Sequence, residues 1–259
     1  MKLTTKTILI TGGTSGIGLE LAKQLLERGN TVLVTGRDPE KLEAARQSLP
    51  GLHTFQSDVS DPGAIKTLCG TVLAQFPMLD ALINNAGIMR NLNLNQDRVL
   101  TDATREIEIN LSGPIQMIQQ FLPHFKTRPE ALIVNVSSGL AFVPLSLSPV
   151  YCAAKAGLHS YTQSLRAQLA GTHVQVIELA SPGVETPLFR GEFAAEMQGQ
   201  KAMDPVVLVN QALVGIEADK LEIRPGLSNV LKTMSRVAPQ FMFAQMTKMG
   251  QPKPIKAAS

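Results

Sequence analysis

The chain of 259 residues is 44% hydrophobic, which suffices for one sizeable core, and α/β folds of this length commonly remain a single domain. Its two cysteines, Cys69 and Cys152, lie far apart without metal-ligand spacing, so the sequence indicates neither a disulfide scaffold nor a metal site. The net charge of +3 is uneven, because residues 226–259 hold five basic residues and no acidic one, and this +5 leaves −2 on residues 1–225. Such a body is not a basic nucleic-acid binder.

The chain enters a strand-like segment at Thr7–Thr11 with no signal-peptide pattern before it. No apolar run approaches the roughly 20 residues needed to span a bilayer. We therefore expect a cytoplasmic protein.

Strand-like and helix-like segments alternate along the chain without internal repeats. The expected strands are Thr7–Thr11, Thr31–Thr35, His53–Gln56, Ala81–Asn84, Leu132–Ser137, Val174–Leu179 and Leu221–Ile223. The expected helices cover residues 17–28, 39–48, 61–76, 102–122, 150–169 and 204–218. Continuous aliphatic strands suit a sheet that is buried on both faces. The alternation predicts an α/β doubly wound parallel sheet, in which ligands bind beyond the carboxyl ends of the strands.

The first strand leads into Thr11-Gly12-Gly13-Thr14-Ser15-Gly16-Ile17-Gly18, which opens directly into a helix. Glycines allow a tight turn, and the start of a helix offers free N–H groups to a pyrophosphate. The spacing Gly-x-x-x-Gly-x-Gly differs from the commoner dinucleotide fingerprint, and a glycine-rich loop alone can be a tight connection. The strand before it and the helix after it favour cofactor binding.

The second strand ends at Gly36-Arg37, where a carboxylate would accept hydrogen bonds from the ribose of NAD. Gly36 leaves space, and Arg37 offers a planar cation suited to a 2′-phosphate, which favours NADP over NAD. The alternative is a solvated Arg that opens a turn. Asp38 also stays open, because it could pair with Arg37 or bind a ribose itself.

Polar residues follow the next strands as well. Asp58 could bond an adenine amino group or cap the next helix. The amides of Asn84-Asn85-Ala86-Gly87 could tie neighbouring strands together, with Ala-Gly as a flat surface for a cofactor, or form a plain turn. Asn110, inside an apolar helix pattern, is either a satisfied core amide or a part of the site. The rigid turn Ser181-Pro182-Gly183, with Thr186, is well placed to bound a nicotinamide.

Tyr151 and Lys155 lie one turn apart if their segment is helical. An ammonium beside a phenol favours the phenolate, so we expect the pKa of Tyr151 to fall towards neutral pH. Such a phenol can donate a proton to a carbonyl oxygen or take one from an alcohol. Ser138 follows the fifth strand, 13 residues earlier, and could converge on the same oxygen. A packed Tyr beside a solvated Lys is the alternative for this pair alone.

Together these residues resemble the short-chain dehydrogenase/reductase (SDR) superfamily over roughly residues 5–190, and the tail resembles its DltE-like subgroup. The resemblance implies a Rossmann-like fold with about seven strands, Tyr151 as acid/base, Ser138 orienting the carbonyl, and Lys155 lowering the Tyr pKa and binding ribose. It assigns to Asn110 a helix kink and a water that relays protons. The expected catalytic residues are Asn110, Ser138, Tyr151 and Lys155, with no metal. The expected NADP(H)-binding residues, with NAD(H) possible, are Gly12, Thr14, Ser15, Gly16, Ile17, Gly18, Arg37, Asp58, Val59, Asn85, Ala86, Gly87, Tyr151, Lys155, Pro182, Gly183 and Thr186.

Two hypotheses follow from the site. The first is an NADP(H)-dependent oxidoreductase that interconverts a small carbonyl compound and its alcohol, and the second is a nucleotide-sensing protein without turnover. We expect an apolar substrate, because the variable stretches carry apolar side chains, although these could equally be ordinary packing. They are Met89, Leu140, Phe142, Val143, Leu188, Phe189, Phe193 and Met197.

The sequence divides into a catalytic domain at 1–225 and a basic C-terminal extension at 226–259. Leu227, Val230, Leu231, Met234 and Val237 fall at helical spacing, with the cations Lys232 and Arg236 off that stripe. The extension could pack on the domain, form a subunit interface, or lie on an anionic membrane surface. For partners we expect a small-molecule substrate, no nucleic acid, and a second copy of the chain in a homodimer or homotetramer.

Overall fold

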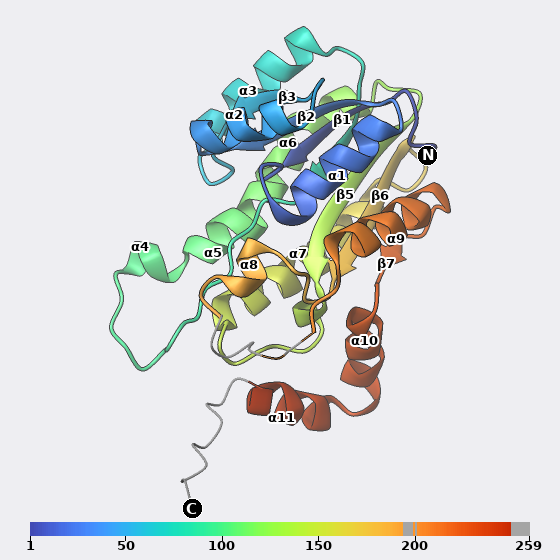
Figure 1. Ribbon diagram of the computed structural model, residues 1–259. Helices are drawn as coiled ribbons and strands as arrows, with labels where there is room; N and C mark the ends of the chain where they lie inside the picture. The colour runs from blue at the N-terminus through green and yellow to red at the C-terminus, as the bar shows by residue number, and fades with distance from the viewer. Residues whose placement is uncertain (194–198, 200, 250–259) are drawn as a thin grey trace, which may run out of the picture.

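A computed structural model describes residues 1–193, 199 and 201–249. Seven parallel strands form one sheet in the order β3-β2-β1-β4-β5-β6-β7, with helices on both faces (Figure 1). The strands are β1 (Thr7–Thr11), β2 (Thr31–Gly36), β3 (His53–Gln56), β4 (Leu79–Asn84), β5 (Ala131–Ser138), β6 (Val174–Ser181) and β7 (Glu222–Ile223). The predicted doubly wound, Rossmann-like α/β fold is therefore confirmed. The strand order reverses between β1 and β4, where such folds bind their ligands.

The helices are α1 (Gly16–Glu27), α2 (Pro39–Ser48), α3 (Pro62–Gln75), α4 (Leu100–Ala103), α5 (Arg105–Ile107), α6 (Gly113–Phe125), α7 (Pro149–Gln168), α8 (Pro187–Arg190), α9 (Pro205–Glu217), α10 (Leu227–Val237) and α11 (Pro239–Met249). Six of them cover the two faces of the sheet in two layers. The first layer, α1, α2 and α9, packs on one face of the sheet. The second, α3, α6 and α7, packs on the other. Among the described residues, no helix has the length and hydropathy needed to cross a membrane.

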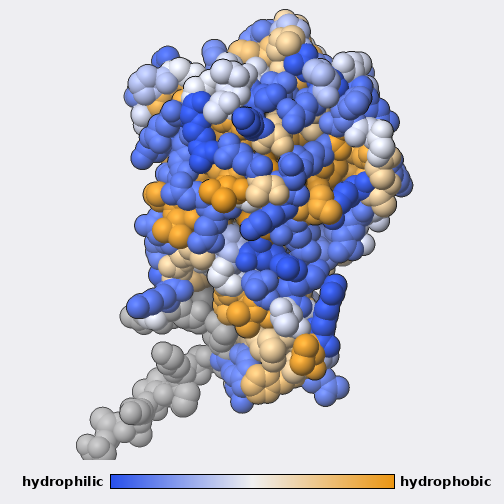
Figure 2. Space-filling model, turned by 90° about the vertical axis from the view of Figure 1, so that its right-hand side faces the viewer, coloured by the Kyte–Doolittle hydropathy of each residue, from blue (hydrophilic) through white to orange (hydrophobic). Residues whose placement is uncertain are grey.

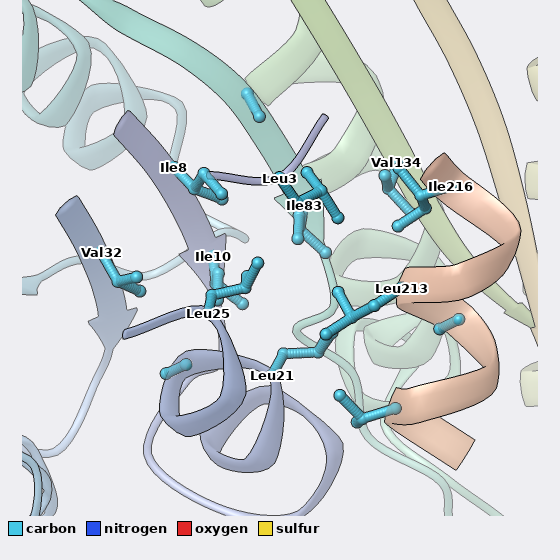
Figure 3. Close-up of a cluster of buried hydrophobic side chains, with 14 of the residues drawn as sticks. Leu3, Ile8, Ile10, Leu21, Leu25, Val32, Ile83, Val134, Leu213 and Ile216 are labelled. Atoms are coloured by element: carbon cyan, nitrogen blue, oxygen red, sulfur yellow. The ribbon is translucent and has the colours of Figure 1, made fainter. Parts of the chain in front are cut away.

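Aliphatic side chains hold the first layer to the sheet. Figure 3 shows Leu21 and Leu25 of α1 and Leu213 of α9 meeting strand residues such as Ile10 and Ile83. All five side chains are at most 2% exposed. Because β1, β4 and β5 are buried on both faces, most of their residues are apolar, which explains their continuous aliphatic runs.

One expected helix is interrupted. Instead of a single helix over 102–122, the chain forms α4, α5, a wide π-helical turn at Glu108–Ser112, and then α6. Within this turn Asn110 is fully buried, and its side chain is engaged with the loop after β4. Gly113 sits so close to the Val59 carbonyl that a Cβ would lie 2.7 Å from its oxygen. The predicted single helix was wrong, because these tertiary contacts set the path of the backbone here.

The C-terminal helices α10 and α11 extend beyond the sheet, below α7 in the view of Figure 1. The face of α10 that is buried carries Ser228, Leu231 and Lys232. Of the expected apolar stripe, Leu231 is buried, whereas Leu227, Val230 and Val237 are at least 49% exposed. Gly139 explains why this face of α10 is buried, because a glycine lets Ser228 pack directly against the backbone there. Figure 2 shows hydrophobic surface at this lower end of the molecule.

Replacing Gly18 of α1 by Ala should destabilise the fold. The new Cβ would lie 2.3 Å from the Gly12 carbonyl oxygen and 2.5 Å from Asn85 Nδ2, so the loop must shift. We expect a loss of about 1–3 kcal/mol in the free energy of unfolding, measured by urea denaturation. Gly70→Ala in α3 is the control, because nothing lies within 4 Å of its Cβ, and it should stabilise by about 0.5–1 kcal/mol. Equal effects of the two substitutions would contradict this account.

Candidate active site

A cavity of about 720 Å³ runs along the carboxyl ends of the strands. It collects nearly all of the residues that the sequence singled out, from seven separate segments of the chain. Those that line it are Gly12, Thr14, Ser15, Gly16, Ile17, Arg37, Asp58, Val59, Asn85, Ala86, Gly87, Ser138, Tyr151, Lys155, Pro182, Gly183 and Thr186. Gly18 and Asn110 do not line it.

The glycine-rich loop shapes one wall of the cavity. Gly12 has a φ of +67°, and a Cβ there would lie 2.7 Å from the Cα of Ala86, so a side chain does not fit. Ser15 precedes α1, and its side chain makes no capping hydrogen bond. The N–H groups in the first turn of α1 therefore have no side-chain acceptor where Gly16 and Ile17 line the cavity. This arrangement fits the pyrophosphate of a dinucleotide.

Gly18 supports this loop from below. The contacts that a Cβ would make there, with Gly12 and Asn85, show that Gly18 lets α1 pack under the loop. Its expected direct contact with the cofactor stays a prediction.

Amides tie the strands together next to the cavity. Asn85 Nδ2 donates to the carbonyls of Thr11 and Gly12 at 3.1 and 3.0 Å, and the Thr11 hydroxyl accepts from two backbone N–H groups after β4. Asn84 Nδ2 donates to Asn135 Oδ1 at 2.9 Å, which joins β4 to β5. These bonds hold β1, β4 and β5 in register where the cavity opens.

Charged groups surround the other end of the cavity, beyond β2 and β3. Asp38 accepts from the N–H groups of Glu40 and Lys41 at 3.0 and 3.2 Å and so caps α2. Arg37 lies 3.8 Å from Asp58 and remains half exposed. Burial raises the pKa of Asp58, but two hydrogen bonds from Ser60 and the charge of Arg37 lower it on balance. Arg37 and Lys41 thus present two cations to the cavity.

Ser138, Tyr151 and Lys155 converge at the inner end of the cavity, and all three are at most 7% exposed. Lys155 Nζ lies 5.7 Å from the centre of the Tyr151 ring and donates to the Val136 carbonyl at 2.8 Å. The Ser138 side chain acts to lower the pKa of the Tyr151 phenol. The expected i, i+4 pairing on α7 is therefore present.

The protonation of this pair differs from the expectation. Burial raises the pKa of Tyr151 above its ordinary value, and this effect exceeds the opposing hydrogen bond from Ser138. Burial also lowers the pKa of Lys155 to about 8, although the charge of Glu178 opposes it. The predicted lowering of the Tyr151 pKa was thus wrong for this state of the protein, because desolvation of the buried phenolate is the dominant effect.

Asn110 acts on the loop after β4. Its Nδ2 donates to the Ile88 carbonyl at 2.8 Å, and its Oδ1 accepts from the Ile88 N–H at 3.0 Å. The π-helical turn around Asn110 gives the kink that the resemblance implied. The side chain positions the backbone next to Gly87, whereas its role in a water relay stays a prediction.

A family model described as short chain dehydrogenase matches residues 6–197. The chain belongs to this family. The uncharacterized oxidoreductase DltE of Bacillus subtilis is 42% identical over 250 residues, which cover 95% of this chain and 98% of DltE. This similarity confirms the expected DltE-like subgroup, and the family makes the chain an oxidoreductase.

Other relatives carry named cofactors. The NADP-dependent 3-hydroxy acid dehydrogenase YdfG of Salmonella typhi is 33% identical over 178 residues, which cover 68% of this chain and 71% of YdfG. A 3-ketoacyl-(acyl-carrier-protein) reductase from Brucella melitensis, solved with NADH, is similar with a TM-score of 0.77 at 27% identity, covering 88% of this chain and all of that one. A Burkholderia cenocepacia short chain dehydrogenase solved with NADP has the same fold, with a TM-score of 0.81 at 24% identity, covering 95% and 99%. Relatives thus use either nicotinamide cofactor.

The dehydrogenase has an apolar wall beside Tyr151. Of the side chains expected there, Met89, Leu140, Leu188 and Phe189 line the cavity. Phe142, Val143 and Phe193 lie instead in the adjoining hydrophobic cluster, and Met197 lies outside the described residues. The sequence did not single out several other apolar lining residues, among them Leu227, Leu231 and Met246 from the C-terminal helices and Leu145 and Met203 from loops. Spacing along the chain gave no sign that α11 reaches the cavity.

The partly buried His159 and the buried Glu178, both near Lys155, were also missed. His159 continues the four-residue spacing of Tyr151 and Lys155 on α7, and Glu178 is a carboxylate inside the apolar strand β6. Both signals were visible in the sequence.

Lys155→Met should make the dehydrogenase more stable at pH 7. Folding lowers the pKa of Lys155, so the folded state binds the lysine proton less tightly than the unfolded state does. Burial of the charged lysine therefore lowers the free energy of unfolding below pH 8. The shift from 10.5 to about 8 corresponds to a gain of up to about 3 kcal/mol on replacement. The gain should shrink between pH 8 and 10.5, as the folded-state lysine becomes neutral. Urea denaturation at pH 7 and pH 10 measures both values.

Lys66→Met on the exposed side of α3 is the control, and its effect should stay within about 0.5 kcal/mol at both pH values. A Lys155→Met variant that is less stable than wild type at pH 7 would contradict the cost assigned to the buried ammonium.

Proposed function

We propose that this dehydrogenase interconverts a small apolar carbonyl compound and its alcohol with NADP(H), and that Tyr151 is the acid/base. The observation that carries the proposal is the burial of Ser138, Tyr151 and Lys155 together at the inner end of the cavity, beside an apolar wall. A bound nicotinamide supplies the hydride. The residues of the chain supply position, hydrogen bonds and the proton.

Ser138 and Tyr151 can both donate hydrogen bonds to one carbonyl oxygen, since both hydroxyls line the cavity. As negative charge develops on that oxygen, these donors stabilise it without the reorganisation that water would need. The raised pKa of Tyr151 keeps its proton on the phenol, ready for transfer in the direction of reduction. The Lys155 ammonium, fixed by the Val136 carbonyl, stabilises the phenolate that remains.

The described side chains that surround Tyr151 support an apolar substrate. Leu140, Leu145, Leu231 and Met246 line the cavity and pack in one hydrophobic cluster with Tyr151. The charged side chains Arg37, Lys41 and Asp58 line its opposite end, beyond β2 and β3. A charged substrate group near Tyr151 would lose its hydration without a partner among these wall residues.

Arg37 and Lys41 support the preference for NADP. Two cations face the part of the cavity next to β2, where the 2′ position of the adenosine ribose would lie. Asp38, the candidate acceptor for an NAD ribose, is engaged in capping α2. YdfG, with its NADP-dependent activity, is consistent with the same choice.

We also propose that residues 226–259 form an extension of the catalytic domain at 1–225, and that copies of the chain assemble into a homodimer or homotetramer. Exposed Val230, Val237, Phe241 and Phe243 on α10 and α11 support an assembly surface, because large apolar groups gather there.

Tyr151→Phe should bind NADPH as well as wild type and lose turnover by a factor of about 10² to 10⁴, because the variant lacks the transferable proton. Nicotinamide fluorescence measures binding, and absorbance of the reduced cofactor measures turnover in a screen of aldehydes, ketones and alcohols. Tyr161→Phe, on the same helix but packed in the core, is the control and should keep its activity. Full activity of Tyr151→Phe would refute the assignment, and a wild type inert on every substrate would favour a nucleotide-sensing protein.

Arg37→Leu should weaken NADPH binding about 10-fold or more, with NADH affinity changed less than about twofold. The reason is the loss of a charge-assisted hydrogen bond to the 2′-phosphate, worth about 1.5–3 kcal/mol. Arg46→Leu on the exposed face of α2 removes the same charge and should leave both affinities unchanged. Equal weakening of both cofactors by Arg37→Leu would argue against a 2′-phosphate contact.

A further inference from the structure

A carboxylate lies buried in the middle of β6. Glu178 is 1% exposed and stands in an otherwise largely apolar strand. One of its oxygens accepts a hydrogen bond from the Ser137 hydroxyl, and the other lies 2.7 Å from His159 Nδ1. A carboxylate removed from water in this way needs both hydrogen bonds and a counter-charge.

His159 is not the counter-charge. Its other ring nitrogen, Nε2, lies 3.0 Å from the Nζ of Lys232 on α10. An ammonium group can only donate, so Nε2 must accept and carries no proton. The single ring proton is then on Nδ1, which donates to Glu178. The imidazole is neutral, and Glu178 is the anion of this pair.

The charge of Lys232, at the end of this hydrogen-bond chain farthest from Glu178, has other partners. Its Nζ lies 3.4 Å from Glu222 of β7 and 4.4 Å from the centre of the Phe142 ring. Arg224 also lies 3.4 Å from Glu222. His159, Glu178 and Glu222 could together surround a metal ion, but the Lys232 ammonium already contacts two of the three. The negative charge of Glu178 therefore needs a different cation, closer to the interior than Lys232.

Lys155 is a cation buried in the same layer. It lies one turn before His159 on α7, and its Nζ donates to Val136, the residue that precedes Ser137 on β5. Lys155 and Glu178 thus bind consecutive residues of one strand, in the layer between α7 and the sheet. The charge of Glu178 favours the protonated form of Lys155 and partly offsets its burial. The titratable and charged groups around this layer are Tyr151, Lys155 and His159 on α7, Glu178 on β6, Glu222 and Arg224 at β7, and Lys232 on α10.

We propose that Glu178 is a positioning residue for the reaction, whose buried carboxylate keeps the Lys155 ammonium charged beside Tyr151. The hydrogen-bond chain from Glu178 through His159 to Lys232 ties this inner charge pair to the C-terminal helix α10. The importance of this pair for turnover rests on the proposed function, whereas the charge state of Lys155 can be measured without it.

Nuclear magnetic resonance of protein labelled with carbon-13 at the lysine ε-carbon measures the titration of Lys155 directly, with no cofactor or substrate present. Lys155→Met identifies the signal. In wild type we expect a pKa near 8. In Glu178→Gln we expect the Lys155 pKa to fall by about one unit or more, a tenfold change in the ratio of neutral to charged lysine. Glu178→Asn, a smaller neutral amide with room for a water molecule, provides a second variant if Glu178→Gln does not fold.

Glu222→Gln is the matched control, since it removes the same charge from the register partner of Glu178 on the neighbouring strand. Because Glu222 pairs with Lys232 and Arg224, the Lys155 titration should move by less than about 0.3 units. An unchanged Lys155 titration in a folded Glu178 variant, an equal shift in Glu222→Gln, or a wild-type Lys155 already neutral at pH 7 would each overturn the proposal.

The pH dependence of kcat/KM separates this proposal from the proposed function. Its alkaline limb should move to lower pH in Glu178→Gln by the same amount as the Lys155 titration, and it should stay in place in Glu222→Gln. A shifted titration with an unmoved limb would overturn the positioning role. Absence of turnover in wild type would instead refute the proposed function and leave the measured charge pair intact.

Discussion

The site depends on one unfavourable group, the ammonium of Lys155 buried between α7 and the end of β5. Water solvates a lysine far better than the interior of a protein does, so every neighbour must compensate for its burial. The Val136 carbonyl accepts its hydrogen bond, and Glu178 supplies opposite charge. The result is a cation fixed beside Tyr151, obtained at the expense of stability. The surrounding sheet, with its aliphatic strands buried on both faces, provides the excess stability that tolerates it.

Much of the fold follows from the sequence for a simple reason. A parallel strand covered by helices on both sides must be apolar at nearly every position, so β1, β4 and β5 show as continuous aliphatic runs between helical segments. The polar residues that interrupt this pattern, such as Asn85, Ser138 and Tyr151, lie where strands end or helices begin. Because parallel strands end at one edge, residues far apart in the chain could be assigned to one cavity before their contacts were known.

The rest of the structure could not be predicted, because it depends on contacts between distant segments that hydrophobic periodicity does not encode. Hydrophobic spacing on α10 left open which face is buried, and the helix buries Lys232, whose ammonium contacts His159, Glu222 and the ring of Phe142. The break in the helix around Asn110 follows from its bonds to Ile88, on a different segment. The pKa of Tyr151 could not be derived from the nearby lysine alone, since burial acts on the phenol as well.

Leu231 and Met246 close the cavity from helices that lie beyond residue 197, where the match to the family ends. The proposed catalytic residues and part of the apolar cavity wall therefore occupy separate stretches of the gene. Descendants of such a protein can change the compounds they accept by altering a short terminal stretch, while the inherited chemistry stays untouched. Sequence divergence confined to α10 and α11 would then indicate a change of substrate rather than a loss of activity.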